Sequence, residues 1–244
     1  MSKRTVAIVL AAGQGKRMNS NVHKQYLLLQ DKPVLYYTLK AFEDSFVEDV
    51  VLVVGSEEEE YCRENIIEKY HFRKVRKIVV GGAERYHSVY AGLKEIATWE
   101  NIEDAYIFIH DGARPFVTEE ILKTAYACVE EEHACIVGMP VKDTIKVVDE
   151  RGYVDQTLNR SRTWSVQTPQ VFTYRLIKTA YELMIAKADE LKEQGIQITD
   201  DAMVVETFTK APVKIVLGSY DNIKITTPED LLVAHEIVSK TIEK

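Results

Sequence analysis

The chain has 244 residues, of which 46% are hydrophobic and 28% charged, so it can bury a sizeable core, which excludes a disordered chain and a disulfide-stabilised mini-protein. The net charge of −7, from 31 Lys and Arg against 38 Asp and Glu, argues against nonspecific nucleic-acid binding. No run of about 18 apolar residues, no signal peptide and no CxxC pair is found, so we expect a cytoplasmic protein without membrane segments, disulfides or zinc.

Short apolar runs rich in Val and Ile predict buried strands along the chain. They cover residues 6–11, 50–54, 77–80, 106–109, 135–137 and 213–217. Most of these runs do not alternate with polar residues, which is typical of strands buried on both faces of a parallel sheet.

Helical segments are predicted between these strands. They cover residues 34–44, 57–70, 85–97, 118–131 and 174–193, and a last helix begins at Pro228 with Thr227 as its N-cap. Alternating strands and helices predict an α/β fold, a doubly wound and mostly parallel sheet of Rossmann-like type. We expect one domain over residues 1–244. Residues 139–170 break the rhythm, so we expect a protruding β-arm at about 139–160.

The segment after the first predicted strand is rich in glycine and cations. Gly13 and Gly15 let backbone N–H groups approach a phosphate, and Arg17 adds positive charge. A dinucleotide fingerprint needs a third glycine where Met18 stands, and a P-loop needs one where Leu10 stands. An atypical loop around a nucleoside triphosphate and a simple glycine turn are the interpretations that remain.

Ligands of open α/β sheets bind beyond the carboxyl ends of the strands, so the segments after later strands are also candidates. Gly82 and Ser88 follow the 77–80 run and suit contacts with a flat base. Asp111 follows the 106–109 run, where a carboxylate can hold Mg²⁺ together with substrate phosphates. Arg114 can bind phosphate oxygens, whereas His110 is expected to be a packed residue and not a base.

The combined motifs resemble the 2-C-methyl-D-erythritol 4-phosphate cytidylyltransferase family. The resemblance extends from about residue 5 to about residue 235, with the motifs in the family's order. They are A-A-G-x-G-x-R-M (11–18), K-Q-Y (24–26), G-G-x-E-R-x-x-S (81–88), H-D-G-A-R-P (110–115), D-T (143–144), Q-T-P-Q (167–170), T-D-D-A (199–202) and N-I-K-x-T (222–226). One departure is His23, where the family often has proline.

The resemblance implies a reaction in which CTP and methylerythritol phosphate, a phosphorylated polyol, give a CDP-alcohol and pyrophosphate in a homodimer with Mg²⁺. It implies that Arg17 and Lys24 stabilise the transition state and that Arg160 and Lys224 position the attacking phosphate. The nucleotide-binding positions are Ala11, Ala12, Gly13, Gly15, Gly82, Arg85 and Ser88. The other substrate-pocket positions are Arg114, Thr144, Thr168 and Thr199, with Asp111 as the metal ligand.

Three other functions compete with this one. A pentitol-phosphate cytidylyltransferase shares the fold and the Q-T-P-Q segment, but Ala12 and the T-D-D-A segment favour methylerythritol phosphate. A non-catalytic nucleotide-binding protein need not keep the charged residues together, and this chain has all of Arg17, Lys24, Asp111 and Lys224. A nicotinamide dehydrogenase is disfavoured by Met18.

Overall fold

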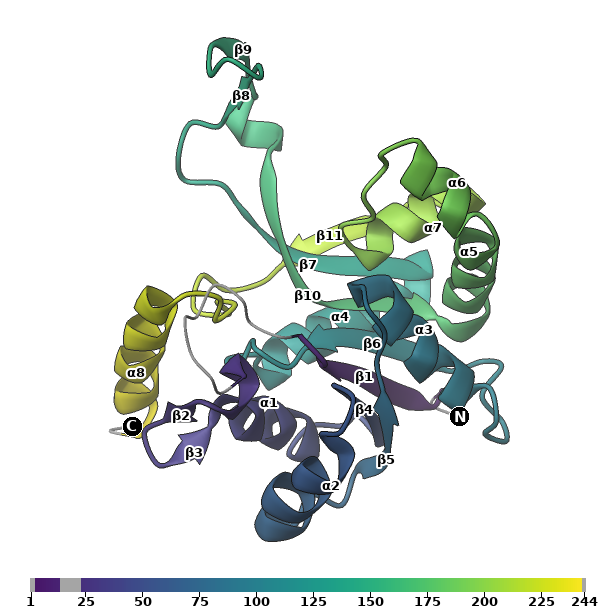
Figure 1. Cartoon of the computed structure of the whole chain (residues 1–244), viewed down its shortest axis with the longest axis vertical. Coiled ribbons are helices and arrows are strands. Elements are labelled where there is room, and N and C mark those ends of the chain that lie inside the picture. The colour runs from purple at the N-terminus through teal and green to yellow at the C-terminus, as the bar shows by residue number, and fades with distance from the viewer. Residues whose placement is uncertain (1–2, 14–22, 243–244) are drawn as a thin grey trace.

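The computed structural model describes residues 3–13 and 23–242. Its centre is a seven-stranded sheet of order β11-β7-β10-β6-β1-β4-β5 (Figure 1). The strands are β1 (Thr5–Ala11), β4 (Asp49–Val54), β5 (Val75–Val80), β6 (Tyr106–Asp111), β7 (Ala134–Pro140), β10 (Trp164–Thr173) and β11 (Lys214–Leu217). All six strands predicted from the apolar runs are therefore confirmed, and so is the α/β fold.

One central strand, β10, is absent from the prediction. It pairs antiparallel with both β6 and β7, whereas β1, β4, β5 and β6 form parallel pairs, as do β7 and β11. The expectation that residues 139–170 depart from the main sheet is thus wrong for residues 164–170, which belong to β10, and for residues 139–140, which end β7. The sequence of β10 holds Pro169 between polar residues, as in a loop, and the pairing with β7 shifts register between Val166 and Gln170.

Helices cover both faces of the sheet. They are α1 (Val34–Glu43), α2 (Glu59–Cys62), α3 (Arg85–Ile96), α4 (Glu119–Glu132), α5 (Tyr174–Ala186), α6 (Ala188–Glu193), α7 (Asp201–Thr209) and α8 (Pro228–Ile242). The segment predicted as one helix over 174–193 is interrupted at Lys187, and the segment 57–70 combines α2 with a π-helical segment, η3 (Arg63–Glu68). Helix α7 was not predicted.

Strand β1 shows why these strands carry no alternation in the sequence. Val6 and Ile8 enter the core beneath α3, α5 and α7, while Ala7 and Val9 enter the core beneath α1 and α4. Both faces of β1 are dry, since these four residues have no exposed surface. Burial of each large apolar side chain contributes roughly 1.5–3 kcal/mol to stability. The two cores therefore stabilise the sheet, including the edge at which the loops meet.

The first turn of α8 fixes the segment before it. The helix begins at Pro228, as predicted, and the Asp230 carboxylate accepts the N–H groups of Thr226 and Thr227 at 2.8 and 2.9 Å. The backbone N–H of Ile225 donates to the carbonyl of Ala113 at 2.8 Å. The segment that carries Lys224 is therefore anchored to the loop that follows β6.

The arm, residues 141–163, leaves the sheet between β7 and β10 and projects from the molecule at the top of Figure 1. It contains the antiparallel pair β8 (Lys146–Val148) and β9 (Val154–Thr157), followed by the short 3-10 helix η4 (Arg160–Arg162). The predicted protruding β-arm is thus present. Within residues 3–13 and 23–242, no helix is long and apolar enough to cross a membrane.

Candidate active site

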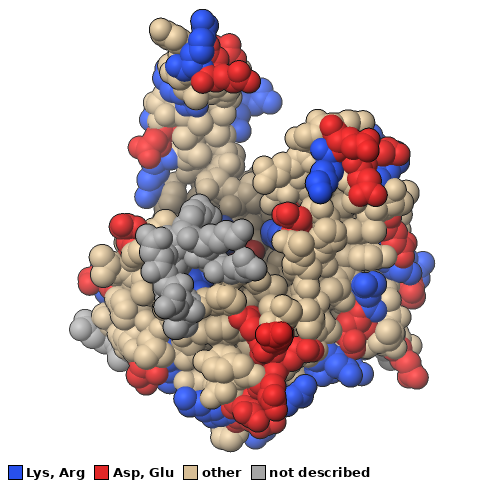
Figure 2. Space-filling view, in the orientation of Figure 1, with Lys and Arg blue, Asp and Glu red and all other residues tan. Residues whose placement is uncertain are grey.

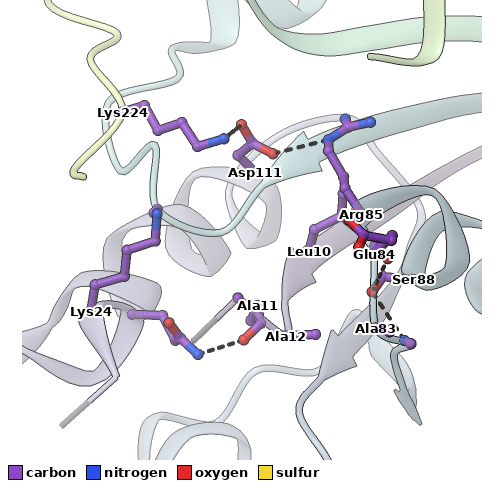
Figure 3. Close-up of a pocket in the computed structure, with 14 residues that line it drawn as sticks. Leu10, Ala11, Ala12, Lys24, Ala83, Glu84, Arg85, Ser88, Asp111 and Lys224 are labelled. Atoms are coloured by element: carbon purple, nitrogen blue, oxygen red, sulfur yellow. Dashed lines mark hydrogen bonds and ion pairs between the residues drawn. The ribbon is translucent and has the colours of Figure 1, made fainter. Parts of the chain in front are cut away.

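A cavity of about 490 Å³ opens at the carboxyl ends of β1, β5 and β6. Its lining combines the loops after these strands with a 3-10 turn, η2 (Lys24–Tyr26), and with the segment before α8 (Figure 3). The predicted site residues that line it are Ala11, Ala12, Gly13, Lys24, Gly82, Arg85, Ser88, Asp111 and Lys224. Residues up to 213 positions apart by their numbering, from Ala11 to Lys224, thus meet at the edge where the open-sheet rule places a ligand.

The glycine pair after β5 lets two loops approach closely. A Cβ atom on Gly81 would lie 2.7 Å from the Cβ of Ala12 and 2.6 Å from the hydroxyl of Ser88. Ser88 is buried, and its hydroxyl accepts the N–H of Gly82 at 3.2 Å. Ser88 therefore braces the turn before α3, and the contact of Gly82 and Ser88 with a flat base stays a prediction.

Asp111 is the electrostatic centre of the cavity. One of its carboxylate oxygens lies 2.8 Å from the Lys224 ammonium, and the Nε atoms of Arg85 and Arg114 each lie 3.7 Å from the carboxylate. Burial raises the pKa of Asp111, but the charges of Lys224, Arg85 and Arg114 outweigh that effect and hold the pKa well below its usual range. This carboxylate is therefore ionised throughout the neutral range.

Arg85 forms an ion pair with a buried acid, Asp201, which is not among the site residues predicted from the sequence. Its guanidinium donates to both carboxylate oxygens of Asp201 at 2.8 and 2.6 Å, and the Tyr181 hydroxyl donates to the same carboxylate at 2.5 Å. The side chain of Asp201 has no exposed surface. Gln170 completes the network by accepting the backbone N–H of Asp201 at 3.0 Å.

The T-D-D-A motif was the signal for this network. Its Thr199, which the sequence analysis assigns to the substrate pocket, is exposed, and Asp200 is the N-cap of α7. Asp201 follows the N-cap as the first residue of the helix, where it points into the protein toward Arg85. The packing of α7 against α5 and β10 sets this orientation of Asp201, and the sequence alone does not reveal it.

His110 and Thr168 lie behind Asp111, where their uncharged side chains form a hydrogen-bond network. The Thr168 hydroxyl accepts the Asp111 N–H at 3.1 Å and lies 3.1 Å from Nδ1 of His110, whose Nε2 lies 3.1 Å from the Arg114 carbonyl. Burial lowers the pKa of His110 to about 4. The ring is thus neutral at pH 7, with Nε2–H donating to the carbonyl, and His110 is the packed residue that was expected.

A second hollow of about 300 Å³ adjoins the cavity beside Arg85 and Asp111. The other predicted substrate residues that line it are Arg114, Thr168 and Thr199. Nε of Arg114 is buried and makes no hydrogen bond among the described residues, and it faces the Asp111 carboxylate at 3.7 Å. The space-filling view shows the molecule hollowed below the arm (Figure 2).

Two predicted residues that the structure describes line neither hollow, and two others are not described. Thr144 and Arg160 are exposed on the arm, where the Arg160 guanidinium donates to the Lys142 carbonyl at 3.4 Å. Gly15 and Arg17 lie outside the described residues. Their assigned roles stay predictions.

The donor set at Asp111 can be compared with what Mg²⁺ requires. The described part of the chain holds no group of three His, Cys, Asp or Glu side chains that could bind a metal on its own. Mg²⁺ in nucleotide enzymes is commonly bound by one or two carboxylates together with substrate phosphates. Asp111, which faces the cavity, fits such a site, and the three neighbouring cations oppose metal binding unless phosphates supply negative charge.

Comparisons with known proteins agree with one another. The family model described as 2-C-methyl-D-erythritol 4-phosphate cytidylyltransferase matches residues 5–240. Proteins with that name from Lachnoclostridium phytofermentans and Alkaliphilus metalliredigens are 49% and 46% identical, over 97% and 98% of this chain and 97% and 95% of theirs. The crystal structure of 4-diphosphocytidyl-2C-methyl-D-erythritol synthase from Anaerococcus prevotii superposes with a TM-score of 0.81 at 34% identity, covering 97% of this chain and 96% of that one.

Proposed function

The chain belongs to the 2-C-methyl-D-erythritol 4-phosphate cytidylyltransferase family, and on this premise we propose how the residues of its pocket carry out the family's reaction. The enzyme transfers CMP from CTP to 2-C-methyl-D-erythritol 4-phosphate and gives CDP-methylerythritol and pyrophosphate, a step of the non-mevalonate route to isoprenoids. The observation that supports the assignment of roles is the meeting of Lys24, Arg85, Asp111 and Lys224 around one cavity.

The chemistry calls for positioning and charge neutralisation. A phosphate oxygen of the alcohol substrate forms a bond to the α-phosphorus of CTP, while the bond from that phosphorus to the bridging oxygen of the β-phosphate breaks. The attacking monoester has a second pKa near 6, so it is largely dianionic at pH 7 and needs no general base. The neutral, buried His110 behind Asp111 agrees with this requirement.

Lys24 and Lys224 approach the cavity from different elements and have different proposed roles. Lys24, on η2, faces Arg85 across the pocket and is proposed to stabilise the charge that grows on the α-phosphoryl oxygens, together with Arg17 (Figure 3). Lys224 lines the cavity and the second hollow, which contains Arg114. It is therefore proposed to position the attacking phosphate.

Asp111 is proposed to hold Mg²⁺ together with the phosphates of CTP. The ion would neutralise phosphate charge and favour departure of pyrophosphate. The Asp111 carboxylate also forms an ion pair with Lys224, whose Nζ lies 2.8 Å from one of the carboxylate oxygens. Lys224 is thus kept beside the reacting centre until phosphates offer it a second partner.

The arm is proposed to complete the neighbouring subunit's site in a homodimer. Thr144 and Arg160, for which substrate contacts are predicted, are exposed on the arm and line neither hollow of their own chain. A second copy of the chain is the partner whose pocket these residues would fit. We further propose that residues 1–244 act as one cytidylyltransferase domain in the cytoplasm, in line with the free thiols of Cys62, Cys128 and Cys135.

Steady-state kinetics in both substrates test these roles. Lys24→Ala and Arg17→Ala should each lower kcat by about 10²–10³ with a smaller change in KM for CTP, because they act on the transition state. Lys224→Ala should also raise KM for the polyol phosphate, and Arg17→Lys should restore activity only in part. If the first two variants raise KM for CTP and keep the wild-type kcat, both residues are anchors. Ribitol phosphate, offered separately, tests the choice of substrate.

A further inference from the structure

A glutamate outside all the recognised motifs contacts the turn that carries Lys24. Glu58 lies in the loop after β4, and one of its carboxylate oxygens contacts Nδ1 of His23. Its other oxygen accepts the Tyr26 hydroxyl at 3.0 Å. The two residues lie on either side of the Lys24–Gln25 pair, so a single carboxylate holds both ends of η2.

A second side-chain hydrogen bond ties the turn to β1. The Gln25 side chain is buried, and its Nε2 donates to the Ala11 carbonyl at 2.5 Å. The backbone closes the turn through Tyr26 N–H to the His23 carbonyl at 2.9 Å. Gln25 therefore fixes the turn to β1, and Glu58 fixes it to the neighbouring loop, while Lys24 and Gln25 both line the cavity.

Burial and further hydrogen bonds fix the orientation of the Glu58 carboxylate. Only 14% of its side chain is exposed, and the same oxygen that accepts Tyr26 also accepts the Gly55 N–H at 2.9 Å. The Tyr26 hydroxyl lies 3.0 Å from Sγ of Cys62. Burial raises the pKa of Tyr26 far above its ordinary value, so its hydroxyl stays protonated and available as a donor.

We propose that Glu58 is a positioning residue for catalysis, which aims Lys24 at the α-phosphate by holding His23 and Tyr26. The proposal rests on the role given to Lys24 above. It assigns no contact between Glu58 and either substrate. A displacement of a catalytic group by about 1 Å can cost about 100-fold in rate, so the loss of this carboxylate should lower kcat and change KM for CTP little.

A purely structural role for Glu58 would lead to different effects on stability and rate. Because Glu58 also accepts the Gly55 N–H, its removal could loosen the loop after β4 without any effect on Lys24. Stability would then fall, and any change in rate would be the same whether Lys24 is present or not. A double-mutant cycle separates these cases, since only residues that act through each other give non-additive effects.

The experiment measures kcat and KM for Glu58→Ala, Glu58→Gln and Tyr26→Phe, each alone and combined with Lys24→Ala. Glu58→Ala should lower kcat about 10- to 100-fold, and the other two variants should cause smaller losses. In the Lys24→Ala background, all three should change kcat less than about twofold. Glu60→Ala is the matched control, because Glu60 is an exposed glutamate two positions away; its kcat should equal that of the wild type.

Each other outcome overturns a stated claim. Equal losses of kcat with and without Lys24 would show that Glu58 acts only on the structure, and wild-type kcat in the Glu58 variants would show that it does not act at all. Wild-type kcat in Lys24→Ala itself would remove the proposed role of Lys24, and the Glu58 proposal with it. Thermal unfolding identifies a misfolded Glu58→Ala, in which case Glu58→Gln and Tyr26→Phe decide.

Discussion

The charged side chains of the pocket and those of the arm differ in burial and in their partners. At the pocket, the lining residue Arg85 forms two hydrogen bonds with the fully buried Asp201, and Asp111 is 10% exposed and faces three cations. In the arm, Arg160 and Arg162 are exposed, and so are apolar side chains such as Tyr153, which is 68% exposed. Charge is balanced by buried partners at the pocket, whereas the arm keeps its cations exposed, including Arg151, which pairs with Asp149 at the surface.

This difference separates stability from function. A buried ion pair loses several kcal/mol when one partner is removed, because the other charge stays buried and uncompensated. An exposed residue that contacts only solvent contributes little to folding. Substitutions in the pocket should therefore change both stability and catalysis, while substitutions in the arm should change catalysis through assembly alone.

The largest effect on stability is expected from Asp201→Asn. Loss of this fully buried carboxylate removes the main partner of Arg85, whose side chain is 26% exposed, and should lower the free energy of unfolding by about 3–5 kcal/mol. For a chain of this size that corresponds to a fall in Tm of about 6–20 °C. Asp189→Asn, an exposed acid on α6, is the control and should change stability by less than about 0.5 kcal/mol. A Tm equal to the wild type in both variants would contradict the account of this network.

The next largest effect concerns the arm. Arg160→Ala and Lys24→Ala should each be nearly inactive, but a mixture that exchanges subunits should recover about a quarter of wild-type activity, because half of the dimers are hybrids with one intact composite site. Activity is measured after mixing, with subunit exchange verified by mass spectrometry. Hybrid dimers without activity would mean that the arm does not complete the neighbour's site.

A smaller effect is expected from the pH dependence of the pocket. Because its neighbours depress the pKa of Asp111 in the folded protein, this carboxylate stabilises the fold above its unfolded pKa of about 3.9. That contribution is lost as the pH falls toward the folded pKa. The free energy of unfolding of the wild type should thus exceed that of Asp111→Asn at pH 7, and the gap should narrow below about pH 4. Urea denaturation from pH 7 to pH 3 measures the gap; a gap that widens in acid contradicts the assignment.

The smallest effect is expected from Tyr153→Ser on the arm. Tyr153 is 68% exposed, so the free energy of unfolding of the chain should change by less than about 0.5 kcal/mol. Sedimentation at a series of concentrations should nevertheless show weaker self-association, since the substitution removes apolar surface offered to a partner. A large loss of stability with unchanged association would reverse the comparison between the arm and the pocket.

The sequence by itself determined the strands of the parallel layers. Runs such as residues 50–54 are apolar without alternation because both faces of the strand are dry, and that property is local and visible in the chain. The start of α8 is equally local, because Thr227, Pro228 and the acids after them are typical of a helix N-terminus. The motifs placed Lys24, Asp111 and Lys224 near one site, since loops after parallel strands meet at one edge.

Tertiary structure alone decided which residues hold those side chains in place. Strand β10 has a loop-like sequence and became a central strand because β6 and β7 pair with it on both sides. Asp201 lies in the T-D-D-A motif, but the motif does not say which of its two acids turns into the protein. Glu58 stands among other acids, and nothing near it along the chain distinguishes it from solvated ones. The roles of both residues depend on Arg85 and His23, which are 116 and 35 positions away. Hydrogen bonds between side chains so distant in sequence form only after the packed cores bring their elements together.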